Sequence, residues 1–173
     1  GQSYWQQAVD YKMNVDIDVK TFQYSGEQEL LYTNNSPDSL KKVFYHLYFN
    51  AFQPQSDMAV RIKTGKDKNT RFDLDIDSLQ PHEIGYLKVS LLKQDGTPVH
   101  YELSETILEV VLAQTLLPGK STLLTLKFEG QIPKIVRRAG RDSEEGVSLS
   151  MAQWYPKMAE YDYEGWNAEP YLG

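Results

Sequence analysis

The sequence contains no cysteine and only three histidines in 173 residues. The lack of cysteine excludes a disulfide framework and any zinc site built on thiolates. It leaves the compartment open, because many exported proteins also lack cysteine. No apolar run is long enough for a transmembrane helix. A chain with 40% apolar and 24% charged residues is ordinary globular protein, long enough to bury a core.

Sustained helical periodicity is also missing, and strict alternation takes its place. Residues 9–19, VDYKMNVDIDV, alternate apolar and polar side chains, which is typical of a half-buried strand. Gly26 is expected to mark a bulge or a close backbone approach. We predict an all-β fold, a saddle-shaped antiparallel sheet or β-sandwich of roughly eight or more strands with an irregular C-terminal segment. The other expected strand regions are 22–34, 41–52, 84–104, 106–114 and 121–132.

The net charge of −6 lies entirely at the C-terminal end. Residues 1–141 hold equal numbers of acidic and basic side chains, whereas residues 142–173 hold seven acids and one base, Lys157. The same end is rich in tryptophan and tyrosine. Solubility is one explanation for such a segment. The other is that the chain is a domain of a larger protein and that this end faces a partner. The acids are Asp142, Glu144, Glu145, Glu160, Asp162, Glu164 and Glu169.

No motif in the chain predicts a catalytic or metal site. His82 opens HEIGY, but the second histidine of a zinc H-E-x-x-H helix is replaced by Tyr86. His46 and His100 stand alone within expected strands. The three carboxylates of residues 73–77, DLDID, are interpreted as a solvated strand face, since calcium-loop spacing is missing. The basic residues of RRAGR are too few to predict nucleic-acid binding in a chain of this charge.

Three stretches resemble the N-terminal β domain of zinc aminopeptidases of the aminopeptidase N and leukotriene-hydrolase type, in a bacterial branch. They are YSGEQELLYTNNSPDSLKKVFYHLYFN, LAQTLLPGKSTLLTLKFEGQIP and SMAQWYPKMAEYDYEGWNAEPYLG. The match extends over nearly the whole chain, and the order and spacing of the stretches make it more specific than any one of them. The resemblance implies an N-terminal β-sandwich domain, residues 1–150, and an extension, residues 151–173, that leads toward a catalytic domain absent from this sequence.

In that family the β domain is not catalytic, and the zinc is held by the following domain. The resemblance therefore implies that this chain holds no catalytic residue, no metal ligand and no cofactor. It implies that the parent protein binds zinc and that the partner of the site is the amino terminus of a peptide substrate. It also suggests a periplasmic or secreted location. Relatives bind the substrate's amino group through Gln-x-Gln or Gln-x-Glu; Gln153 matches the first position and Tyr155 departs from the second.

Two alternatives stay open. The first is a stand-alone β-sandwich module that binds carbohydrate or protein, since aromatic-rich surfaces suit such a role. The second is a scaffold domain of an aminopeptidase homologue that has lost its zinc. The sequence predicts neither the preferred substrate residue nor the oligomeric state.

Overall fold

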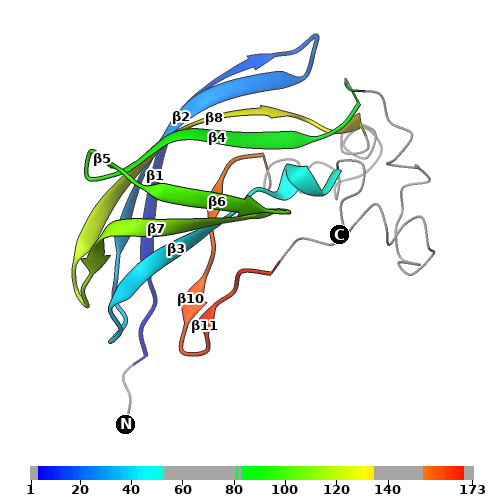
Figure 1. Cartoon of the computed structure of the whole chain (residues 1–173). Helices are drawn as coiled ribbons and strands as arrows, with labels where there is room; N and C mark the ends of the chain where they lie inside the picture. Colours follow the sequence, from blue (N-terminus) through cyan, green and yellow to red (C-terminus); the bar gives the residue numbers. More distant parts are fainter. Residues whose placement is uncertain (1–3, 53–80, 82, 135–153, 170–173) are drawn as a thin grey trace, which may run out of the picture.

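The computed structural model describes residues 4–52, 81, 83–134 and 154–169. In these residues the chain forms two larger antiparallel sheets that pack face to face, as Figure 1 shows, and a separate two-stranded sheet, β10-β11. A five-stranded sheet has the order β1-β2-β8-β4-β5, and a four-stranded sheet has the order β6-β7-β3-β9. The all-β prediction is thus confirmed. The strands are β1 Ala8–Asp18, β2 Gln23–Thr33, β3 Leu40–His46, β4 Tyr86–Gln94, β5 Thr97–Pro98, β6 His100–Ser104, β7 Ile107–Leu116, β8 Ser121–Gln131, β9 Lys157–Met158, β10 Tyr161–Asp162 and β11 Gly165–Trp166.

The core lies between the sheets and comes from the alternation seen in the sequence. Every second side chain of β2 and β8 points inward, and the two strands pair over their full length without a shift in register. Burial of one face fixes this register, because a shift by one residue would expose the apolar set. Opposite them, β3 and β7 supply the inner face of the second sheet. The fully buried side chains include Leu30, Tyr32, Val43, Tyr45, Leu87 and Leu124.

Two glycines on this inner face make room for aromatic rings. Gly26 pairs with Phe128, and Gly130 pairs with Tyr24. A Cβ on Gly26 would lie 2.8 Å from Cζ of Phe128 and 2.5 Å from the carbonyl oxygen of Asn14. The expectation for Gly26 is therefore confirmed as a close approach and not as a bulge. A ring over each glycine also fills the space that a missing side chain would leave in the strand.

The prediction of a single strand over residues 41–52 is wrong. β3 ends at His46, and residues Tyr48–Phe52 form a 3-10 helix, η1. The reason is a tertiary contact. The Asn50 side chain accepts a hydrogen bond from the Leu87 N–H (2.9 Å) and donates one to the Leu87 carbonyl (3.1 Å). The buried Asn50 amide thus pairs with the β4 backbone as a neighbouring strand would. The 3-10 helix places Asn50 in the position to do so.

Region 84–104 also divides differently from the prediction. Asp95 and Gly96 adopt the expected positive φ values, 48° and 84°, and close the β4–β5 hairpin. However, β5 has only two residues, and the chain then enters the other sheet as β6. Gln94 joins the sheets at this point, since its side chain exchanges two hydrogen bonds of 3.0 Å with the backbone of Gln114. No helix in the described residues has the length and apolar character needed to cross a membrane.

Candidate functional site

Residues 154–169 form a docked segment along the open side of the sandwich, between the edge strand β1 and β3. Figure 1 shows the segment in orange and red, running to the β10–β11 hairpin. Its first strand, β9, pairs with β3 through Tyr45–Met158 and His46–Lys157. Lys157 and Met158, within the acidic and aromatic end of the chain, thus form an edge of the four-stranded sheet.

Four hydrogen bonds hold the start of this docked segment to both sheets. The buried Gln28 donates from Nε2 to the Pro156 carbonyl (2.8 Å), and the Tyr24 hydroxyl donates to the Trp154 carbonyl. The Met158 N–H donates to the Tyr11 hydroxyl oxygen (2.8 Å), while the neighbouring Ala159 N–H donates to the Phe44 carbonyl of β3 (2.8 Å). Because Gln28, Tyr24 and Tyr11 belong to the five-stranded sheet, the segment connects the two layers.

The tryptophans of the docked segment pack on the chain's own sandwich. The Trp154 ring lies edge-on to Tyr24, with centroids 5.9 Å apart, and 6.1 Å from Phe128. The Trp166 ring lies 5.6 Å from Phe44 and is stacked at 6.3 Å on Tyr32. Both rings anchor the segment to the sandwich, and among its described aromatics Tyr163 is 83% exposed.

His46 couples the end of the docked segment to β3. Its Nε2 lies 3.0 Å from the Asn167 carbonyl, so this nitrogen carries the proton and donates. Its ring is stacked on Tyr48 at 4.9 Å. Burial lowers the pKa of His46 and outweighs the hydrogen bond to the Asn167 carbonyl, which raises it. Lys157 lowers this pKa and Glu160 raises it by smaller amounts. Burial therefore favours the neutral ring, with its proton on Nε2.

Of the two predicted amine-binding residues, Tyr155 is described and Gln153 lies outside the described residues. The Tyr155 ring is half-buried, edge-on to Tyr11 at 5.4 Å and 5.1 Å from Trp154. Burial raises the pKa of Tyr155 above its ordinary value, so the phenol is protonated at neutral pH. Such a ring meets an ammonium group through its π face or its oxygen lone pairs, without a formal negative charge.

The other sequence candidates form no reactive group in the described residues. Glu83 of HEIGY forms an ion pair with Lys134, His82 lies outside, and the strand residue His100 contacts only Glu102, in an exposed pair of 3.3 Å. Residues 73–77 and 137–141 also lie outside. No group of three or more His, Asp or Glu side chains in the described part of the chain is placed to hold a metal ion.

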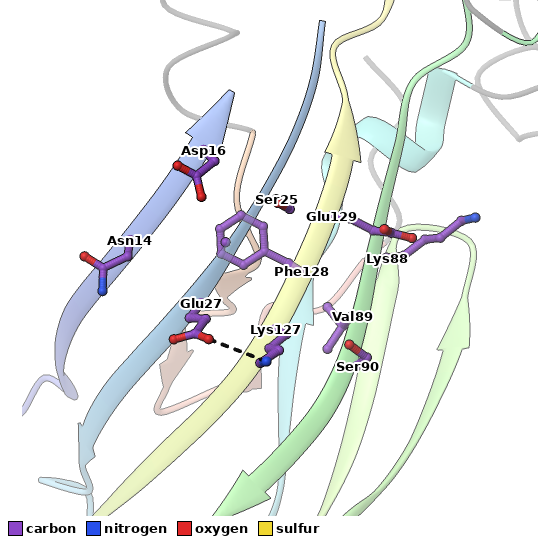
Figure 2. Close-up of a pocket in the computed structure, with 11 residues that line it drawn as sticks. Asn14, Asp16, Ser25, Glu27, Lys88, Val89, Ser90, Lys127, Phe128 and Glu129 are labelled. Atoms are coloured by element: carbon purple, nitrogen blue, oxygen red, sulfur yellow. Dashed lines mark ion pairs between the residues drawn. The ribbon is translucent and has the colours of Figure 1, made fainter. Parts of the chain in front are cut away.

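A hollow of about 420 Å³ lies on the outer face of the five-stranded sheet. Figure 2 shows its lining on four neighbouring strands, with acidic and basic side chains mixed. Glu27 and Lys127 form an ion pair of 3.6 Å, and both side chains are more than half exposed. Exposed pairs of this kind contribute about 0–1 kcal/mol. We interpret this face as solvated, without a preference for one sign of charge.

Sequence reasoning missed Tyr11 and Gln28 as the residues that fix the docked segment. A signal for Gln28 was present, because it is polar at an inward position of β2, between the inward residues Gly26 and Leu30. A buried polar side chain needs a partner. The local pattern does not predict that this partner is the Pro156 carbonyl, 128 residues away.

No searched protein family matches the sequence, and no curated protein matches it. Solved structures with a similar fold include an M1 zinc metallopeptidase from Deinococcus radiodurans, at 16% identity and a TM-score of 0.46, with 74% of this chain and 21% of that chain covered. A mutant of that enzyme bound to a Tyr-Ser-Ala substrate has the same identity and TM-score, with 73% of this chain and 21% of that chain covered. A two-domain M1 zinc metallopeptidase mutant bound to L-tryptophan also has 16% identity and a TM-score of 0.46, with 74% of this chain and 21% of that chain covered. The likeness is distant, and this chain spans about one fifth of the length of those structures.

Proposed function

We propose that this chain is the non-catalytic N-terminal β domain of a zinc-dependent aminopeptidase. The observation that carries the proposal is the docked segment. The stretch with the family-like pattern QWYPKMAEYDYEGW is fixed at Trp154, Pro156 and Met158 by hydrogen bonds to the sandwich. A domain that serves to position a following catalytic unit needs a rigid exit of this kind, because flexible exits lose the geometry of a shared cleft.

In this proposal Tyr155 contributes to the site of the substrate's amino terminus. Its ring is held between Tyr11 and Trp154, so its orientation is set before a substrate arrives. The zinc belongs to a catalytic domain of the same polypeptide, which supplies the metal ligands. Periplasmic or secreted location is part of the same proposal and rests on the family resemblance.

The test uses the protein encoded by the whole gene, with this chain alone as the comparison. Release of amino-terminal residues from short peptides is measured with and without a zinc chelator. We expect cleavage by the whole protein that the chelator abolishes, and none by the 173-residue chain. Tyr155→Leu in the whole protein should raise KM more than it lowers kcat, because it removes a binding contact.

Two outcomes contradict the proposal. A whole protein without zinc and without cleavage favours the scaffold reading or the binding-module reading. An active enzyme in which Tyr155→Leu and wild type have equal KM retains the domain assignment but removes Tyr155 from the substrate site. Tyr101→Leu is a matched control, since Tyr101 is a half-buried tyrosine of β6, in a different strand from the docked segment.

A further inference from the structure

A groove of about 780 Å³ runs between the start of the chain and the docked segment. One bank is formed by residues 4–7 with Val9 and Tyr11 of β1, and the other by residues 157–163. The floor is apolar and includes Met158 and Ala159, both at most 5% exposed. Its volume lies in the range of about 300–1,000 Å³ that is usual for ligand sites.

Aromatic rings line the groove. Trp5 and Tyr161 lie 5.8 Å apart across it and link the two banks. Burial and the hydrogen bond to Asp38 raise the pKa of Tyr161 to about 12, so this ring is neutral. Tyr4 and Tyr163, in contrast, are 89% and 83% exposed. The groove thus has a fixed aromatic wall and two tyrosines whose faces are available to a ligand.

The charge of the groove is acidic. Glu160 is exposed, and its carboxylate forms no hydrogen bond or ion pair with the described part of the chain. The Asp162 carboxylate, in contrast, accepts hydrogen bonds from the Glu164 N–H and the Asn167 side chain. Lys157 is the one basic residue in the lining. An available carboxylate beside exposed aromatic faces favours a cationic side chain, which both groups attract.

One bank of the groove is also the open edge of a sheet, since β1 is the last strand of the five-stranded sheet. β9 is the last strand of the four-stranded sheet, but its Met158 N–H already donates to the Tyr11 hydroxyl. Edge strands present backbone N–H and C=O groups that their own ladder does not use. An extended peptide matches such an edge, because its backbone N–H and C=O groups repeat at the spacing of a strand, whereas a sugar has no such repeat.

We propose that this groove binds an extended peptide segment of a partner protein that carries lysine or arginine side chains. The aliphatic stems lie on the floor formed by Met158 and Ala159. The charged ends meet Glu160 and the ring of Tyr163. The site involves no free amino terminus and is independent of the function proposed above.

The test titrates the 173-residue chain with acetyl-Gly-Lys-Gly-Lys-Gly-amide, followed by NMR chemical shifts and by calorimetry. The acetyl group removes the free amino terminus, so recognition at Tyr155 contributes nothing. We expect shifts confined to the residues that line the groove, and weaker binding as salt rises from about 20 mM to about 500 mM. Glu160→Gln and Tyr163→Ala should each weaken binding by about two- to fivefold.

Glu164→Gln is the matched control, because Glu164 is an exposed acid of the same hairpin that does not line the groove. It should bind the peptide like wild type. Equal binding by Glu160→Gln and wild type would overturn the proposal, as would shifts that map elsewhere or no binding at all. Binding of cellohexaose in the groove without binding of the peptide would assign the site to a glycan and would also overturn it.

Discussion

The hydrogen bond between the Tyr11 hydroxyl and the Met158 N–H offers a direct test of how the docked segment is held. Tyr11→Phe removes only the oxygen atom and keeps the ring, including its edge contact with Tyr155 at 5.4 Å. Met158 is 5% exposed, so its N–H would stay buried without the acceptor it has now. An unpaired buried backbone donor costs about 1–3 kcal/mol.

This cost falls on the docked segment and therefore shows first in local opening. A loss of about 1–3 kcal/mol corresponds to an increase of about 5- to 150-fold in the exchange rate of the Met158 amide. Amide exchange is measured by NMR on the uniformly labelled chain at constant pH. Urea unfolding of the same samples reports the free energy of global unfolding, which we expect to fall by no more than the local value.

Tyr45→Phe is the matched control. Tyr45 is fully buried opposite Met158, and its hydroxyl has no hydrogen-bond partner in the described residues. Removing such a hydroxyl should leave stability unchanged or raise it slightly. The reasoning is refuted if the Met158 amide exchanges equally in Tyr11→Phe and wild type. It is also refuted if Tyr45→Phe loses as much stability as Tyr11→Phe.

Three further predictions concern the sandwich itself. Gly130→Ala would place a methyl group against the Tyr24 ring, which cannot move without losing its hydrogen bond to Trp154; we expect a loss of about 1–3 kcal/mol in urea unfolding, and an unchanged midpoint would contradict this account. Asn50→Ala would leave both backbone groups of Leu87 unpaired and should lower the free energy of unfolding by about 2 kcal/mol or more. Asn14→Ala, at an exposed site, should lower it by less than about 0.5 kcal/mol. Equal urea midpoints for the two variants would exclude the bridging role of the Asn50 amide. Burial holds the pKa of His46 below its ordinary value of 6.5. As pH falls, the unfolded chain therefore binds a proton at this residue before the folded chain does. The free energy of unfolding should fall as pH drops from about 7.5 through 6.5 toward the folded-state pKa. His46→Gln should remove this dependence, and a variant that keeps it would show that another group is responsible.

Most of the strands were predictable, because alternation over several residues is a local property. Residues 9–19 and 121–132 show on their own which face of the strand is apolar, and Asp95-Gly96 shows where a tight turn falls. Burial of one face then fixes the register between β2 and β8. Tyr155 was found through a family resemblance and not through any local rule, and its role stays a prediction.

The arrangement of the strands in two sheets was decided by tertiary contacts. The same local pattern describes β4 and β6, yet β4 pairs with β8 in one sheet and β6 with β7 in the other. Similarly, the 3-10 helix replaces a predicted strand because Asn50 finds the backbone of Leu87, 37 residues away. Propensity is a weak influence where a buried polar group must find its partner.

By itself the sequence determined that the chain is a β protein with an acidic, aromatic end. Only the tertiary structure decided what that end does. Gln28 and Tyr11 lie 128 and 147 residues from their partners in the docked segment. Alternation and turn propensity act over a few residues, whereas a hydrogen bond between such distant segments depends on the positions that the whole packed sandwich gives them. For that physical reason the sequence predicts the strands, and the folded chain determines where the C-terminal segment docks.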